Sequence, residues 1–170
     1  MSPAARIASI LAVPAMAVAG NAATEEHYYY TRERAVSATG MCKAATYDAG
    51  RSLRYRPIGI FNSGSSAVDI SCALRSEFVD DYQVSASFYN YNATPVTVTC
   101  AVLSGSRDSG SPAYVRNTSV SVPAGSSASV SGYAGWFNPT DFASLSCRLP
   151  GGVEMGTITA NGFCYYGCAY

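Results

Sequence analysis

The most regular feature of this chain is an alternation of apolar and polar residues with a period of two, from residue 57 onward. In the segment 96–102 one face carries three valines and Cys100, whereas the other face carries two threonines and an alanine. This period is typical of a β-strand with one buried face. The same alternation recurs in further short segments, which turn residues separate from one another: 68–74, 84–88, 118–122, 128–132 and 143–149.

The number and spacing of these segments predict an all-β protein of eight or nine short strands. No segment shows a sustained helical periodicity, so we expect an antiparallel, disulfide-stabilised β-sandwich. The pattern does not distinguish a jelly-roll-like from an immunoglobulin-like topology. The strands on either side of the turn at 92–95 are predicted to form a hairpin, as are segments 118–122 and 128–132.

The chain divides into three regions by composition. Residues 1–22 combine a weakly basic start, an apolar run over 7–18 and small residues after it, which predicts a signal peptide that is removed on export. Residues 23–56 mix charged and aromatic residues without a clear period, and we expect an irregular segment that packs on the domain. Residues 57–170 form the predicted sandwich.

Six cysteines in an exported chain of this size predict disulfide bonds. Three of them, Cys72, Cys100 and Cys147, occupy inward positions of similar strands, so at least one must pair outside this trio. Six cysteines allow 15 connectivities, of which we prefer Cys42–Cys72, Cys100–Cys147 and Cys164–Cys168. Free buried cysteines and a metal site using Cys164 and Cys168 are the alternatives, although that spacing is not typical of zinc sites. We therefore predict no metal and no cofactor.

Charge and catalytic motifs exclude several functions. The 11 basic and 11 acidic residues balance, so nothing favours nucleic acid as a partner, and no segment of the sandwich has the ~20 apolar residues of a membrane span. His27 is the only histidine and lies close to the predicted cleavage point, which argues against a histidine-dependent triad. A hydrolase based on two carboxylates remains a third hypothesis, with these candidates: Asp69, Glu77, Asp80, Asp81, Asp108, Asp141 and Glu154.

Aromatic residues outside the predicted core favour binding over catalysis. Tyr89 and Tyr91 lie on the outward face near the end of a strand, and Tyr133, Trp136 and Phe137 lie in a predicted loop. Exposed aromatic rings can stack on sugars or anchor a protein, although Trp136 and Phe137 can also cap the core. We therefore predict a secreted or periplasmic, non-catalytic module that binds a glycan or a protein of the cell envelope. A structural or self-associating surface protein is the alternative.

From about residue 58 to 160 the chain resembles a diffuse group of short secreted bacterial proteins of unknown function. The resemblance rests on Gly59-Ile-Phe-Asn62, on successive strands with a lone cysteine, and on Cys147-Arg-Leu-Pro150. It implies a secreted β-sandwich and brings no activity and no site residues. The ending with Cys164 and Cys168 departs from that pattern.

Overall fold

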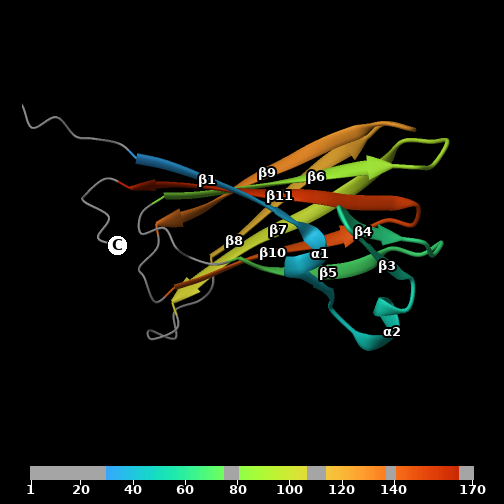
Figure 1. The fold of residues 1–170 in the computed structure, drawn as a ribbon, viewed down its shortest axis with the longest axis horizontal. Helices are drawn as coiled ribbons and strands as arrows, with labels where there is room; N and C mark the ends of the chain where they lie inside the picture. The colour runs from blue at the N-terminus through green and yellow to red at the C-terminus, as the bar shows by residue number, and fades with distance from the viewer. Residues whose placement is uncertain (1–29, 75–80, 107–113, 137–140, 165–170) are drawn as a thin grey trace, which may run out of the picture.

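The computed structural model describes residues 30–74, 81–106, 114–136 and 141–164, and within them the chain forms eleven strands and two one-turn helices. The strands make two antiparallel sheets, which confirms the predicted β-sandwich. Figure 1 shows the long strands of both sheets running along the molecule, with α1 and α2 beside the short strands.

Sheet A follows the order β3-β4-β11-β6-β9, and β1 pairs with β11 on the side of β11 that also receives β4. Its strands have these bounds: β1 Tyr30–Ser37, β3 Leu53–Arg56, β4 Gly59–Asn62, β6 Asp81–Asn90, β9 Ser127–Trp136 and β11 Val153–Cys164.

Sheet B follows the order β2-β5-β10-β7-β8. Its strands have these bounds: β2 Cys42–Ala44, β5 Val68–Leu74, β7 Val96–Ser106, β8 Tyr114–Val122 and β10 Asp141–Leu149. The helices α1, Ala38–Met41, and α2, Tyr47–Gly50, flank β2.

The pairing of the strands identifies the sandwich as a jelly roll. In sheet B β7 pairs with β8 and β5 with β10, whereas in sheet A β6 pairs with β9 and β4 with β11. These four pairs are nested in the sequence, as in a long double strand that is rolled into two sheets. Such nesting is characteristic of a jelly roll with its two Greek keys and answers the topological question that the sequence pattern left open.

Both predicted hairpins are wrong. Strands β6 and β7, on either side of residues 91–95, belong to different sheets, and so do β8 and β9. The short connections cross from one sheet to the other instead of reversing the chain within one sheet. The alternation identified the inward residues correctly, but a strand presents the same pattern whichever sheet it joins.

The segment 30–56, which we predicted to be irregular, contains β1, β2, β3 and both helices. Strand β1 pairs with β11 over eight positions, from Tyr30 opposite Cys164 to Ser37 opposite Thr157. Its sequence shows no clear alternation, and its residues Glu33 and Ala35 are exposed. The predicted signal peptide, residues 1–22, lies outside the described residues.

The predicted inward faces form the core. Every second residue of β5 is buried, and the inward residues of β6, β7 and β10 are almost fully inaccessible. They pack together with residues of β4 and β11, so the core lies between the two sheets. The largest of the completely buried side chains are Phe88, Ile60, Ile70, Leu145, Leu149, Met155 and Ile158.

Two of the three preferred disulfides are confirmed, namely Cys42–Cys72 and Cys100–Cys147. Neither bridge crosses the core from one sheet to the other, because both join directly opposite residues on neighbouring strands of sheet B. The reason is that β7 and β10 are neighbours in the jelly roll. The Cys164–Cys168 pairing lies outside the residues whose side chains are described.

Two buried asparagines fix the crossings from sheet A to sheet B. Asn62 ends β4 and donates to the carbonyls of Ser66 and Leu149, while the Gly64 amide donates to its Oδ1. Asn90 ends β6 and repeats this arrangement two strands further along the chain. Its Nδ2 donates to the carbonyl four residues ahead and to the last carbonyl of β8, and its Oδ1 accepts from the amide two residues ahead. Each asparagine therefore closes its own turn and also attaches sheet A to sheet B.

Candidate functional site: the outer face of sheet A

The outer face of sheet A carries ordered rows of polar side chains, because directly opposite residues on antiparallel strands point to the same side. Four rows cross β1 or β4, β11, β6 and β9. From one end to the other they are Glu33–Asn161–Gln83–Tyr133, Ala35–Thr159–Ser85–Ser131, Ser37–Thr157–Ser87–Ser129 and Phe61–Glu154–Tyr89–Ser127. In the third row the register between β11 and β6 shifts, and Thr157 is joined to Ser87 by hydrogen bonds of the Ser87 hydroxyl. At about 3.3 Å per residue, the distance along β6 from the first row to the last is about 20 Å.

The two middle rows are dominated by hydroxyl groups. The serines of β9 and Thr157 are exposed, and Ser85, Ser87 and Thr159 are half-buried. Ser87 is already bonded, since its Oγ donates to the Thr157 carbonyl at 3.2 Å and accepts from the Thr157 amide at 2.9 Å. This bond spans the irregular register between β6 and β11, where Gly156 lies against the Ser87 hydroxyl. The centre of the face is therefore uncharged and rich in hydrogen-bonding groups.

The first row contains an amide oxygen that lacks a donor. Asn161 Oδ1 is buried and accepts no hydrogen bond within the part of the chain that the structure describes. Its direct neighbours across the sheet are Glu33 and Gln83, both exposed. A buried acceptor without a donor costs free energy, so a ligand hydroxyl that donates to Asn161 would recover it.

Three aromatic rings gather at the other end of the face. The centroids of Tyr89 and Tyr91 lie 4.6 Å apart, and the Phe61 ring meets the Tyr91 ring edge-on with 5.3 Å between centroids. The tyrosines stay 39% and 54% exposed, so both rings present surface to solvent. The Tyr89 hydroxyl donates to the Gly125 carbonyl at 3.0 Å, which attaches the ring to the turn between β8 and β9.

A charged pair holds this aromatic cluster in place. Glu154 is 4% exposed, and its Oε2 accepts from the Arg56 guanidinium and from the Tyr91 hydroxyl, each at 2.8 Å. The Arg56 guanidinium also lies 4.3 Å from the centre of the Phe61 ring. The hydrogen bond to Glu154, with a contribution from burial, raises the pKa of Tyr91 above its usual value. Tyr91 is therefore a fixed, protonated donor and an exposed ring at once.

The structure brings three of the five predicted binding residues to this one face. Tyr89 and Tyr91 lie together as the sequence suggested, and Tyr133 lies at the opposite end. Tyr133 does not lie in a loop as predicted, because β9 continues to Trp136. The Trp136 side chain and Phe137 lie outside the described residues.

Other residues of the face were missed by sequence reasoning. Gln83 and Asn161 are far apart in the chain and become neighbours only through the pairing of β6 with β11. Arg56 lies on β3 and Phe61 lies on β4. Of the two, only Phe61 could have been identified from the sequence, by its outward position on the strand. Glu154 was considered as a catalytic acid, but it is paired with Arg56.

The described part of the chain contains neither a metal-binding cluster nor a membrane-spanning helix. There, no group of three or more His, Cys, Asp or Glu side chains is arranged to hold a metal ion. None of the helices in the same ranges is long and apolar enough to cross a membrane.

Comparison with known proteins finds structural likeness without a sequence family. No protein-family model matches the sequence, and no curated protein matches it either. Among solved structures, the N-terminal CBM22-1–GH10 modules of Clostridium thermocellum xylanase 10B align over 82% of this chain and 26% of that one, with 14% identity and a TM-score of 0.48. The CBM22-1 xylan-binding domain of Paenibacillus barcinonensis Xyn10C aligns over 82% of this chain and 87% of that one, with 9% identity and a TM-score of 0.45.

A third solved structure is a fungal enzyme. The Podospora anserina GH26-CBM35 β-(1,4)-mannanase aligns over 79% of this chain and 28% of that one, with 13% identity and a TM-score of 0.45. The chain thus spans little more than a quarter of the length of this mannanase, and a similar share of the clostridial xylanase.

Proposed function

We propose that this protein is a secreted or periplasmic, non-catalytic module that binds a neutral polysaccharide along the outer face of sheet A. The observation that carries the proposal is the composition of that face, with hydroxyl groups in the middle, amide groups beside Tyr133 at one end, and Tyr89 and Tyr91 at the other end. Sugars offer hydroxyl groups at their edges and apolar C–H groups on their faces. Polar side chains can hydrogen-bond to the sugar hydroxyl groups, and tyrosine rings can pack against the C–H faces.

The proposal assigns a separate role to each part of the face. The rings of Tyr89 and Tyr91 stack on sugar faces, since an aromatic ring with a polar end suits a ligand that is half apolar and half wet. Gln83, Asn161 and the Ser and Thr rows supply donors and acceptors to the sugar hydroxyls. The buried Asn161 oxygen is the position with most to gain from a ligand donor.

A neutral ligand is favoured by the charges on the face. Glu33 is an exposed carboxylate, and Glu154 is already neutralised by Arg56. An acidic polymer would be repelled at the first row and would find no free cation beside it among the outward residues of the four rows. The two observed disulfides agree with an oxidising compartment.

The test is affinity electrophoresis of the whole chain in gels that contain soluble xylan, galactomannan or β-glucan. We expect at least one polymer to retard the protein. Tyr89→Ala and Tyr133→Ala, at opposite ends of the face, should each weaken that binding about fivefold, since an aromatic contact contributes on the order of 1 kcal/mol.

Val115→Ala is the control, because it removes a side chain that is 52% exposed and lies on β8 of sheet B, away from this face. Unchanged retardation of folded Tyr89→Ala and Tyr133→Ala would contradict the proposal. So would sedimentation data showing that the same two substitutions abolish self-association, because the face would then be a protein interface.

A further inference from the structure

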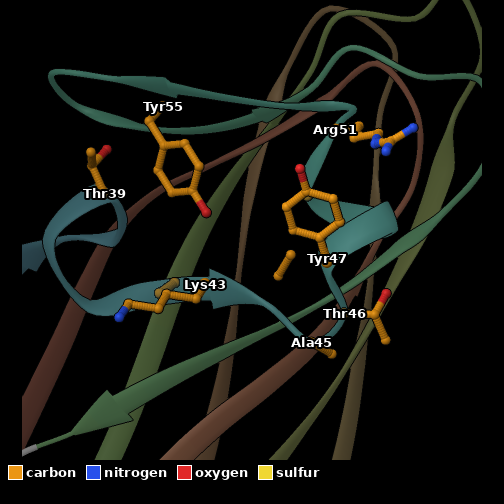
Figure 2. Close-up of a pocket in the computed structure, with 10 residues that line it drawn as sticks. Thr39, Lys43, Ala45, Thr46, Tyr47, Arg51 and Tyr55 are labelled. Atoms are coloured by element: carbon orange, nitrogen blue, oxygen red, sulfur yellow. The ribbon is translucent and has the colours of Figure 1, made fainter.

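A second candidate site lies where the edges of the two sheets meet. Strand β2 is the edge of sheet B and β3 is the edge of sheet A, and α2 connects them. Between them is a pocket of about 570 Å³, a volume within the range of small-molecule sites. Figure 2 shows the rings of Tyr47 and Tyr55 in the space between β3 and β2.

The side chains of this pocket are aromatic and basic. Tyr47 on α2 and Tyr55 on β3 are 84% and 50% exposed, and both line the pocket. Lys43 on β2, the only lysine of the whole chain, lines it together with Arg51. No acidic residue is among the described lining residues, and Asp48, the nearest acid in sequence, makes only a long, exposed ion pair with Arg51 at 3.7 Å.

The frame of the pocket is rigid although its surface is exposed. Cys42, at the start of β2, is tied to β5 by a disulfide. The Ala45 amide donates to the Asp69 carbonyl at 2.8 Å, and Thr39 Oγ1 donates to the Gly59 carbonyl at 2.8 Å. Because the backbone is fixed on these sides, the two rings need little reorganisation to receive a ligand.

The side chains of Lys43 and Tyr55 have no polar partner within the described part of the molecule. Neither side chain makes a hydrogen bond or an ion pair with any residue that the structure describes, whereas the Arg51 guanidinium lies 5.5 Å from the centre of the Tyr47 ring. Two rings and an unpaired ammonium group that line the same pocket suit a ligand that has an apolar face and a negative charge.

We propose that this pocket binds an acidic sugar of the hexuronate class. Tyr47 and Tyr55 pack against the C–H faces of the ring, and Lys43 donates to its carboxylate. Arg51 adds positive charge beside Tyr47. The site differs from the outer face of sheet A in the sign of its charge and is independent of the function proposed there.

The experiment is calorimetric titration of the whole chain, disulfides intact, with trigalacturonate. The matched probe is the same trisaccharide with its carboxyl groups reduced to alcohols. We expect saturable binding of the acid, weaker binding of the reduced sugar, and a decrease in affinity with added salt. Lys43→Gln should weaken trigalacturonate binding about tenfold, the usual size of one charge-assisted hydrogen bond, and Lys43→Arg should restore most of it.

Arg116→Gln is the matched control, because it removes the same charge from β8, the opposite edge of sheet B. An equal loss in Arg116→Gln and Lys43→Gln would mean that only net charge matters and would overturn the proposal. Equal binding of hexaglutamate would overturn the assignment to a sugar, and absence of trigalacturonate binding would overturn both. Tyr89→Ala should leave this titration unchanged, so failure here is distinguishable from failure of the polysaccharide face.

Discussion

Replacement of Asn90 by aspartate tests the asparagine that attaches sheet A to sheet B. Asn90 is completely buried, and the two hydrogens of its Nδ2 are shared among three carbonyls, those of Thr94 at 2.8 Å, Val122 at 3.1 Å and Pro123 at 3.3 Å. Asn90→Asp keeps the shape of the side chain but replaces the donor with an oxygen. That oxygen then faces three acceptors.

The expected loss of stability follows from these contacts. Each lost hydrogen bond contributes about 1 kcal/mol, and the new carboxylate is buried without a cation. We expect the free energy of unfolding at pH 7 to fall by about 3 to 5 kcal/mol, a large share of the 5–15 kcal/mol typical of a whole domain.

The loss should depend on pH in one direction. Burial and the three carbonyls raise the pKa of the new carboxyl in the folded state above its unfolded value of about 3.9. The full penalty therefore applies above the folded pKa. It shrinks as the pH falls through that pKa, because the protonated carboxyl is uncharged and donates one hydrogen bond.

Urea unfolding at pH 7 and pH 5, followed by circular dichroism, measures both effects. Asn117→Asp is the control, since Asn117 is exposed on β8 and the same substitution there should change the free energy of unfolding by less than about 0.5 kcal/mol. A loss below about 1 kcal/mol for Asn90→Asp, or a loss that grows as the pH falls, would refute the reasoning.

Three further predictions concern the frame around the site. Cys100→Ala with Cys147→Ala should lower the free energy of unfolding by about 4 kcal/mol in denaturant titrations, from the chain entropy of a loop with a sequence separation of 47. Arg56→Met should lower the free energy of unfolding by about 3 kcal/mol, because it leaves the buried Glu154 carboxylate without its cation. Glu154→Gln should lower it by less than about 1.5 kcal/mol, and thermal melts of the two variants compare these losses. Gly59→Ala should cost about 2 kcal/mol in urea, because a Cβ at this position collides with the backbone of β11.

A specific result would contradict each of these three predictions. Equal stability of the double cysteine variant and the parent would show that the loop is already constrained without the bridge. A larger loss in Glu154→Gln than in Arg56→Met would mean that the carboxylate is not the costly buried partner. A neutral Gly59→Ala would show that β4 and β11 can separate freely.

The buried faces followed from the sequence because they depend on local alternation. Val98, Cys100 and Val102 share a face whatever strand lies beside them, so their burial needs no knowledge of the partner. The pairing of the strands did not follow in the same way. A turn such as residues 91–95 can reverse the chain within a sheet or lead it to the other sheet, and the apolar pattern is the same in both cases.

The binding face was predictable only in part for the same reason. Tyr89 follows the alternation of β6 and was correctly placed outside, next to Tyr91. Asn161, Gln83 and Tyr133 form one row only because β6 pairs with both β11 and β9. Such a row depends on register over long sequence separations, which a single sequence does not display.

The nested order of the strands also determines at which stage of folding the outer face of sheet A is completed. Among the four nested pairs, β7–β8 is closest in sequence, whereas β4, and β1 outside these pairs, join β11, which lies much further along the chain. Because closing a longer loop costs more entropy, we expect the inner pairs to form first and the outer pairs last. The row from Glu33 to Tyr133 is complete only when β1 has joined β11, so recovery of polysaccharide binding during refolding should report the final step and lag behind the formation of sheet B.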